Sequence, residues 1–267
     1  MKIYFTRHGQ VFPFTFMGDE MYERGDHPLT PLGEEQAELL GKRLKTIGFA
    51  GKIYASPFRR TIQTAVAIAK ETGCLIYPFP YIHECYTNDE RARVFRGMDI
   101  DKIRERFPCI APEAQMVFPW FAGKAETPEE VIERVAVGLK QVEAAGEDCL
   151  LVGHGASMNG VRKYFGVEHP KGMKSWNCGL SCVEKKEGEE SFSCLMYYNT
   201  EHLPYEKISC NGLMKSEDDI AIAKAAEEAA KAAAEEAANA AAGEAADAET
   251  AKTAEAAVKD GTAPKGE

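Results

Sequence analysis

Strand and helix signals alternate through the first 214 or so residues, and this alternation limits the folds that the chain can adopt. Short β-type runs at residues 2–6, 53–55 and 75–77 are separated by stretches that open with Thr30-Pro31 and Ser56-Pro57. A Thr or Ser before Pro is typical of a helix start, because the hydroxyl caps free N–H groups and Pro fits the first turn. Such alternation predicts an α/β sheet with mostly parallel strands.

The second half of this region continues the pattern. Thr127-Pro128 opens a third helix, with Glu130 placed for a capping box. Residues 149–152 form a continuous apolar run, which is typical of a strand buried on both faces. Two further β-type runs at 180–183 and 192–198 are joined by a short link and predict a hairpin. We therefore expect a three-layer αβα sandwich with a mostly parallel central sheet.

The last 51 residues differ from the rest in composition. Of these, 22 are Ala, none is aromatic, and 13 are acidic against 5 basic, so most of the formal net charge of −10 lies here. We predict a catalytic domain at residues 1–214 and a low-complexity tail at 215–267. Alanine favours a helix at about 218–242, whereas residues 261–267 are expected to be disordered. A solvated extension is the favoured interpretation of the tail, and a docking or spacer segment is the alternative.

Composition and cysteine spacing exclude several classes of protein. No apolar run reaches the roughly 18 residues of a membrane span, and the N-terminus lacks a secretory signal pattern. The eight cysteines form no C-x-x-C pair, so we expect reduced thiols in a cytoplasmic protein, without a metal site or cofactor. Without the last 51 residues the chain holds 29 acidic and 27 basic residues, a balance that gives no reason to expect nucleic acid as a partner. The oligomeric state is not predicted.

Arginine and histidine residues follow the predicted strands. Arg7-His8 comes directly after the first strand, Arg59-Arg60 soon after the second, and His154 after the apolar run at 149–152. Because ligands of such sheets bind beyond the carboxyl ends of the strands, we expect these groups to meet at one edge. Guanidinium forks match the geometry of phosphate, and helix N-termini favour the same anion. The pattern predicts a site for a phosphoryl group.

Two histidines are more than phosphate binding alone needs. An unprotonated imidazole can attack phosphorus while a backbone carbonyl holds its other ring nitrogen. The reaction also needs an acid for the departing alkoxide, and Glu84 lies just beyond the third predicted strand. Partial burial facing an anion is expected to raise the pKa of Glu84. These residues favour phosphoryl transfer to a histidine.

Four sequence blocks resemble those of the histidine phosphatases, also called the phosphoglycerate mutase-like superfamily. They span roughly residues 1–200 and are Arg7-His8-Gly9, residues 26–33 (Asp-His-Pro-Leu-Thr-Pro-Leu-Gly), residues 56–65 (Ser-Pro-Phe-Arg-Arg-Thr-Ile-Gln-Thr-Ala) and Gly153-His154-Gly155. The resemblance implies that His8 becomes phosphorylated and that Arg7, Arg60 and His154 hold the phosphoryl group. It selects Arg60 rather than Arg59 for this role. It also implies that Glu84 is the general acid, with Glu90 as the nearby alternative.

Departures from the family pattern favour a phosphatase over a mutase. The mutases carry an acidic residue and a Trp-Asn pair where this chain has residues 10–14 (Gln-Val-Phe-Pro-Phe), and residues 95–97 (Phe-Arg-Gly) replace the usual Glu-Gly. We expect a metal-independent phosphomonoester hydrolase that acts on a small phosphorylated metabolite through a phosphohistidine. The alternatives are a mutase that moves phosphate within a sugar acid, and a non-catalytic phosphate-binding or adaptor protein.

Further residues are candidates for contacts with the substrate. Gln10 either donates a neutral hydrogen bond to phosphate or is an ordinary loop residue, and the N–H groups of Gly155 and Ala156 are additional donors. The long loop at 85–126 is either a specificity cap or a region with a plain amphipathic helix. As a cap it would bind a second anionic group through arginines, Arg96 among them, and close over the substrate with the aromatic residues at 118–121. The plain helix would turn Ile100, Ile103 and Phe107 inward, and it is preferred for Arg104 and Arg106.

Overall fold

Six strands form one mixed sheet in the order β3-β2-β4-β1-β5-β6. The computed structural model describes residues 1–12, 26–94, 97–116 and 124–210, together with Leu213, Met214, Glu228 and Ala232. Strands β3, β2, β4 and β1 run parallel, whereas β5 pairs antiparallel with β1 and with β6. The predicted mostly parallel sheet with a terminal hairpin is confirmed. The strands are β1 (Lys2–Arg7), β2 (Lys52–Ala55), β3 (Ile76–Pro78), β4 (Cys149–Gly153), β5 (Leu180–Glu184) and β6 (Ser193–Asn199).

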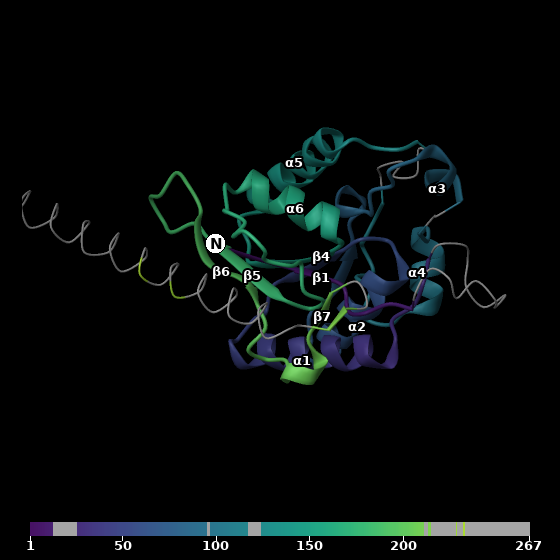
Figure 1. Cartoon of the computed structure of the whole chain (residues 1–267), viewed down its shortest axis with the longest axis horizontal. Coiled ribbons are helices and arrows are strands. Elements are labelled where there is room, and N and C mark those ends of the chain that lie inside the picture. Colours follow the sequence, from purple (N-terminus) through teal and green to yellow (C-terminus); the bar gives the residue numbers. More distant parts are fainter. Residues whose placement is uncertain are drawn as a thin grey trace, which may run out of the picture. The chain divides into compact units, whose positions relative to one another are not determined.

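Two pairs of helices cover the two faces of the sheet (Figure 1). One face carries α1 (Pro31–Thr46) and α2 (Arg59–Thr72), and the other carries α5 (Pro128–Ala145) and α6 (Gly155–Tyr164). Strand β4 is buried along its whole length and alternates between the two faces. Leu150 and Val152 join the apolar cluster beneath α1 and α2, and Cys149 and Leu151 join the cluster beneath α5 and α6. The predicted three-layer sandwich is therefore confirmed.

Shorter elements fill the connection between β3 and α5 and the segment after β6. The first connection holds η1 (Pro80–Ile82), α3 (Asp89–Val94) and α4 (Ile100–Arg106), and the last segment holds η2 (Tyr205–Lys207), β7 (Ser209–Cys210) and β8 (Leu213–Met214). In α4, Ile103 is fully buried and Ile100 and Phe107 are half-buried, as the plain amphipathic helix predicts. Arg104 and Arg106 lie on its exposed side. Arg96 and residues 118–121 lie outside the described residues, so the specificity cap stays a prediction.

Helix caps follow the sequence at two of the three predicted starts. Thr30 Oγ1 accepts a hydrogen bond from the N–H of Gly33 at 3.0 Å, and Thr127 and Glu130 complete the capping box of α5. The prediction for Ser56 is wrong, because α2 begins at Arg59 and no side chain caps it. The Ser56 hydroxyl instead contacts a ring nitrogen of His154 at 2.8 Å. This contact between neighbouring strands outcompetes the local capping signal.

The chain divides into two compact units, residues 1–223 and 224–267. Of the second unit the structure describes only Glu228 and Ala232, both in helical conformation. The predicted disorder of residues 261–267 lies outside the described residues, as does nearly all of the helix predicted at 218–242. In the described part of the chain, no helix combines the length and the apolar character that a membrane crossing requires.

Two glycines bring the start of α1 against the loop that follows β1. A Cβ atom on Gly33 would meet the carbonyl oxygen of Gln10, and one on Gly9 would meet the carbonyl oxygen of Gly33. Since backbone atoms are in the way, we expect Gly33→Ala to lower the Tm by about 5 °C, as overpacking usually costs about 1–3 kcal/mol. Thermal unfolding of Gly33→Ala beside the exposed Glu34→Ala tests this, and equal Tm values for the two variants would contradict it.

Candidate active site

The register of three parallel strands places the predicted site residues side by side. Arg7 of β1 lies opposite Gly153 of β4, and Ala55 of β2 lies opposite Val152. The residue that directly follows each of these strands therefore lies at the carboxyl edge of the sheet. These residues are His8 after β1, His154 after β4 and Ser56 after β2. The ring centroids of His8 and His154 are 5.3 Å apart. The geometry thus brings together two imidazoles that are far apart in the sequence.

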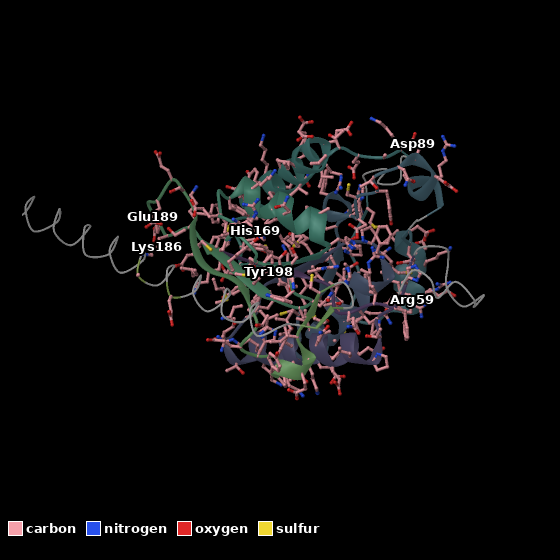
Figure 2. The ribbon with its side chains drawn as sticks, viewed as in Figure 1. Arg59, Asp89, His169, Lys186, Glu189 and Tyr198 are labelled. Atoms are coloured by element: carbon pink, nitrogen blue, oxygen red, sulfur yellow. The ribbon has the colours of Figure 1, made fainter. Side chains whose placement is uncertain are left out.

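The labelled residues of Figure 2 show which end of the molecule this edge faces. Arg59, at the start of α2, and Asp89, at the start of α3, lie at the carboxyl end of the parallel strands. Lys186 and Glu189, in the turn between β5 and β6, lie at the opposite end. The connection that contains α3 and α4 is therefore close to the edge where the histidines meet.

His8 is buried and its ring is neutral. Its Nδ1 lies 2.7 Å from the carbonyl oxygen of Gly9. A carbonyl only accepts hydrogen bonds, so Nδ1 carries the proton and Nε2 keeps its lone pair. Burial, together with the charges of Arg60 and Arg7, holds the pKa of His8 well below its ordinary value. At neutral pH the ring is in the form that a nucleophile requires.

Hydrogen bonds from three elements fix the backbone around His8. Its N–H donates to the carbonyl of Gly153 at 3.0 Å, and its carbonyl accepts from Nδ2 of Asn177 at 2.9 Å. The N–H of Gly9 donates to Oγ1 of Thr64 in α2 at 3.1 Å. The position of the imidazole is thus set by the sheet and by the helix layer together.

Residues near the end of the described chain support the same loop. Ser209 donates through Oγ to Oδ1 of Asn177 at 3.2 Å, and its Oγ accepts from Nε2 of Gln36 at 3.0 Å. Oε1 of Gln36 in turn accepts from the N–H of Gln10 at 2.9 Å. Nη1 of Arg7 donates to the carbonyl of Ser175 at 3.0 Å and lies 3.4 Å from Sγ of Cys210. The sequence patterns do not predict this network.

The other predicted substrate contacts have different surroundings. Gln10 faces α1, where its Oε1 accepts a hydrogen bond from Oγ1 of Thr30 at 3.0 Å. Gly155 and Ala156 are the first two residues of α6, so their N–H groups have no carbonyl partner within the helix. Arg96 lies outside the described residues. The structure therefore gives Gln10 a role at the start of α1, and it places the α6 N–H groups directly after His154.

Arg60 lies in the first turn of α2 and is almost fully buried. Its Nη2 is 3.2 Å from Oε2 of Glu84. Among the described residues, its Nη1 is buried and has no hydrogen-bond partner. A buried cationic donor that lacks an acceptor is costly, and an incoming oxyanion supplies the acceptor. Nη1 of Arg60 is therefore a candidate donor for an oxyanion.

The Glu84 carboxylate is shared between Arg60 and the second histidine. Oε2 lies 3.3 Å from Nδ1 of His154, and Oε1 accepts from the N–H of Cys85 at 3.0 Å. Burial favours the neutral acid, but His154 and Arg60 outweigh it and hold the pKa of Glu84 well below its ordinary value. This direction is opposite to the predicted rise, because here the carboxylate is itself the anion that Arg60 binds. A raised pKa requires a second anion in the pocket.

His154 is fully buried and is oriented by Ser56. Burial lowers the pKa of His154 to about 4, although the neighbouring Glu84 opposes this shift. The neutral ring carries one proton, which belongs on Nδ1 facing the carboxylate, so the Ser56 hydroxyl donates to Nε2. The ring of Phe58 packs edge-on against His154 at 5.2 Å, and the Arg60 guanidinium lies 4.7 Å from the centre of the same Phe58 ring. Nδ1 of His154 thus faces the Glu84 carboxylate.

The same groups raise the question of a metal ion. His8, Glu84 and His154 each offer one ligand atom, and these atoms lie within 4.8 Å of one another. Two imidazoles and a carboxylate are ligands that zinc accepts. The charges of Arg60 and Arg7 also act on both rings, however, and they oppose a dication in this pocket. The complete donor set fits an oxyanion better than a cation.

Buried neutral histidines make the stability of the fold pH-dependent. Burial lowers the pKa of His154 to about 4 and that of His83, beside Glu84, to about 3. Below pH 6.5 the unfolded chain takes up protons that the folded chain cannot. The free energy of unfolding therefore falls by up to about 1.4 kcal/mol per pH unit for each histidine. We expect a loss of about 2 kcal/mol from each between pH 7.5 and pH 5.

Urea unfolding at these two pH values measures this loss. Between pH 7.5 and pH 5 the free energy of unfolding of His154→Gln is expected to fall by about 2 kcal/mol less than that of the wild-type protein, because glutamine does not titrate. Equal pH dependence in the two proteins would contradict the burial of a neutral ring at residue 154.

Comparisons with known proteins agree with this fold. A family model described as "Histidine phosphatase superfamily (branch 1)" matches residues 3–198. A probable phosphoglycerate mutase, GpmB, of Photorhabdus laumondii is 26% identical over 189 residues, which cover 69% of this chain and 85% of that protein. The rat 6-phosphofructo-2-kinase/fructose-2,6-bisphosphatase 1 is 25% identical over 237 residues, which cover 85% of this chain but only 45% of the rat protein.

Solved structures of phosphatases share the fold. The ecdysone phosphate phosphatase of Bombix mori, in complex with tungstate, superposes with a TM-score of 0.61 at 17% identity, covering 76% of this chain and 95% of that one. A phosphoserine phosphatase from Entamoeba histolytica, in complex with 3-phosphoglyceric acid, gives a TM-score of 0.51 at 18% identity, covering 76% and 99%. At these identities the likeness concerns the fold alone.

Proposed function

Because this chain belongs to the histidine phosphatase superfamily, we propose that it hydrolyses a small phosphomonoester through a phosphohistidine intermediate. The family, expected from four sequence blocks, is confirmed by the match over residues 3–198. One observation carries the proposed activity. Nη1 of Arg60 is buried and has no hydrogen-bond partner among the described residues. The charge of the same guanidinium helps to lower the pKa of the neutral His8 ring, so the two groups lie close together. A free oxyanion donor beside an imidazole lone pair is what phosphoryl transfer to nitrogen needs.

In the proposed first step, Nε2 of His8 attacks phosphorus and the bond from phosphorus to the leaving oxygen breaks. Arg7 and Arg60 neutralise the phosphoryl oxygens, and Nδ1–H of the neutral His154 ring donates a hydrogen bond to them, with the N–H groups at the start of α6 as further donors. The arriving phosphate draws Arg60 and His154 away from Glu84 and adds its own negative charge. The pKa of Glu84 then rises, so that it carries a proton and gives it to the leaving oxygen.

The second step reverses the role of Glu84. Its carboxylate takes a proton from a water molecule while the water oxygen attacks the phosphorus of phosphorylated His8. The bond from phosphorus to Nε2 breaks, inorganic phosphate leaves and the neutral imidazole is restored. The same carboxyl group is thus the general acid of the first step and the general base of the second.

A mutase is the second candidate, because relatives such as the Photorhabdus laumondii protein are named probable phosphoglycerate mutases. A mutase returns the phosphoryl group from histidine to another hydroxyl of the substrate instead of to water. The residues at 10–14 and 95–97, which replace the acidic, Trp-Asn and Glu-Gly features of the mutases, support the hydrolase.

A panel of phosphoesters, assayed with the full-length protein and a chelator, tests the proposal. We expect release of inorganic phosphate and an acid-labile, alkali-stable phosphoryl group on His8 after rapid quenching. A relocated phosphate on a sugar acid, with a requirement for a bisphosphate, would establish the mutase instead. Thermal stabilisation by phosphate without turnover of any ester would indicate a binding or adaptor protein.

A further inference from the structure

A second buried ion pair holds the Glu84 loop, residues 83–88 between η1 and α3. Arg134, in α5, is only 9% exposed, and its Nε and Nη2 donate to the two carboxylate oxygens of Glu126 at 2.6 and 2.8 Å. The same guanidinium donates through Nη1 to the carbonyl of Tyr81 at 2.6 Å and through Nη2 to the carbonyl of His83 at 3.4 Å. One planar fork thus joins Glu126 to the backbone that immediately precedes Glu84.

His83 and the backbone of Glu126 complete the attachment of this loop. Nδ1 of His83 donates to the carbonyl of Glu84 at 2.6 Å, and its Nε2 lies 4.0 Å from Oε1 of Glu126. The N–H of Glu126 donates to the carbonyl of Tyr86 at 3.1 Å, and Sγ of Cys85 donates to the carbonyl of Glu126 at 3.6 Å. Residues on both sides of Glu84 are therefore tied to the segment that enters α5.

We infer that Arg134 is a positioning residue that fixes the carboxyl group of Glu84 at the leaving oxygen of the substrate. The inference rests on the proposed function of Glu84 as general acid. A general acid has to lie within about 2.6–3.2 Å of the atom that it protonates, and a displacement of about 1 Å costs about 100-fold in rate. The hydrogen bonds of Arg134 go to the Glu84 loop and to Glu126, so its effect on the reaction passes through that loop.

Leaving groups of different basicity separate positioning from a general contribution to folding. A good leaving group such as 4-nitrophenolate departs with little help from an acid, whereas the alkoxide of glycerol phosphate needs a proton. In this mechanism, kcat/KM reports the steps up to departure of the leaving group. A displaced Glu84 therefore lowers kcat/KM for the alkyl ester far more than for the aryl ester. A loss of folded protein lowers both by the same factor.

Arg134→Lys is the informative substitution, because it keeps the charge and removes the planar fork. We expect kcat/KM to fall about 100-fold for glycerol phosphate and less than about fivefold for 4-nitrophenyl phosphate. Glu84→Gln sets the reference, with the same selectivity and a larger loss. Glu126→Gln, which weakens the fork from its other side, is expected to show the same selectivity with a smaller loss, and it serves if Arg134→Lys does not fold.

Arg162→Lys is the matched control. Arg162 in α6 also joins a backbone carbonyl to a side-chain oxygen, at Val167 and Asn159, but without contact to the Glu84 loop. Its kcat/KM is expected to stay within twofold of wild type for both esters. Equal losses for the two esters in Arg134→Lys, or no loss, would overturn the inference. If Glu84→Gln lowered kcat/KM equally for the two esters, Glu84 would not be the general acid. An inactive wild-type protein would rule out the proposed function together with the inference.

Discussion

Replacement of His8 by alanine is expected to lower kcat for 4-nitrophenyl phosphate by about 10⁴-fold or more. The variant lacks the Nε2 lone pair that attacks phosphorus in the proposed mechanism, although Arg60 and His154 remain in place. We therefore expect phosphate to stabilise His8→Ala and the wild-type protein against heat to the same extent. Steady-state turnover, a thermal shift with inorganic phosphate, and quenching with radiolabelled substrate measure the three consequences. No phosphoryl group should be trapped on the variant.

His169 provides the control for this substitution. It is exposed, and its ring contacts Oη of Tyr197 at 2.7 Å and the carbonyl of Met173 at 3.0 Å. In Figure 2 it lies near Tyr198 on the hairpin side of the sheet, away from Arg59. His169→Ala is expected to turn over substrate at the wild-type rate. A wild-type rate in His8→Ala would show that the nucleophile is another group.

Replacement of Arg60 by lysine is expected to lower kcat/KM by about 10³-fold. The Arg60 guanidinium holds Glu84 through Nη2, and its Nη1, which has no partner among the described residues, is the proposed donor to a phosphoryl oxygen. A lysine ammonium is a single point charge and cannot present two donors at these fixed positions. We also expect the inhibition constant of inorganic phosphate to rise by about 100-fold, because ground-state binding uses the same donor. Steady-state kinetics with and without phosphate measure both effects.

Arg59→Lys is the matched control for Arg60→Lys, because the two arginines are adjacent in sequence. Arg59 is the first residue of α2, and its backbone N–H donates to Oδ1 of Asp26 at 2.6 Å, a contact that the substitution leaves in place. We expect less than a twofold change in kcat/KM for Arg59→Lys. The opposite ranking of the two variants would show that the resemblance to the family selects the wrong arginine.

Local signals predict those parts of the fold that local interactions decide. Thr30 and Thr127 cap helices because their acceptors and donors lie within three residues. The apolar run of β4 is buried as expected, since a strand between two helix layers has no polar face. Ser56 carries the same signal as Thr30, but strand register sets its hydroxyl beside His154. The outcome depends on pairing with a strand almost 100 residues later, which the local pattern does not contain.

The support of the site is harder to predict than its reactive groups. Arg134 falls on the buried stripe of α5 between Val131 and Gly138, so a charged residue at an inward position was an available signal. Gln36 likewise lies on the buried face of α1. Their partners come from distant segments, and neither residue type is specific to one chemistry. The direction of the pKa shift of Glu84 also depends on distances to Arg60 and His154 that only the folded chain defines.

The position of β1 in the sheet affects how the protein is made. Of the six strands in this sheet β1 is synthesised first, yet its neighbours are β4 and β5, which begin at Cys149 and Leu180. Both edges of an apolar strand therefore stay unpaired on the nascent chain until most of the domain has been synthesised, and pairings so distant in sequence form slowly. The contacts that Ser209 and Cys210 make with Asn177 and Arg7 beside the loop after β1 form only later still. We therefore expect the surroundings of His8 to stay incomplete, and β1 to be accessible to chaperones, until these later segments have been synthesised.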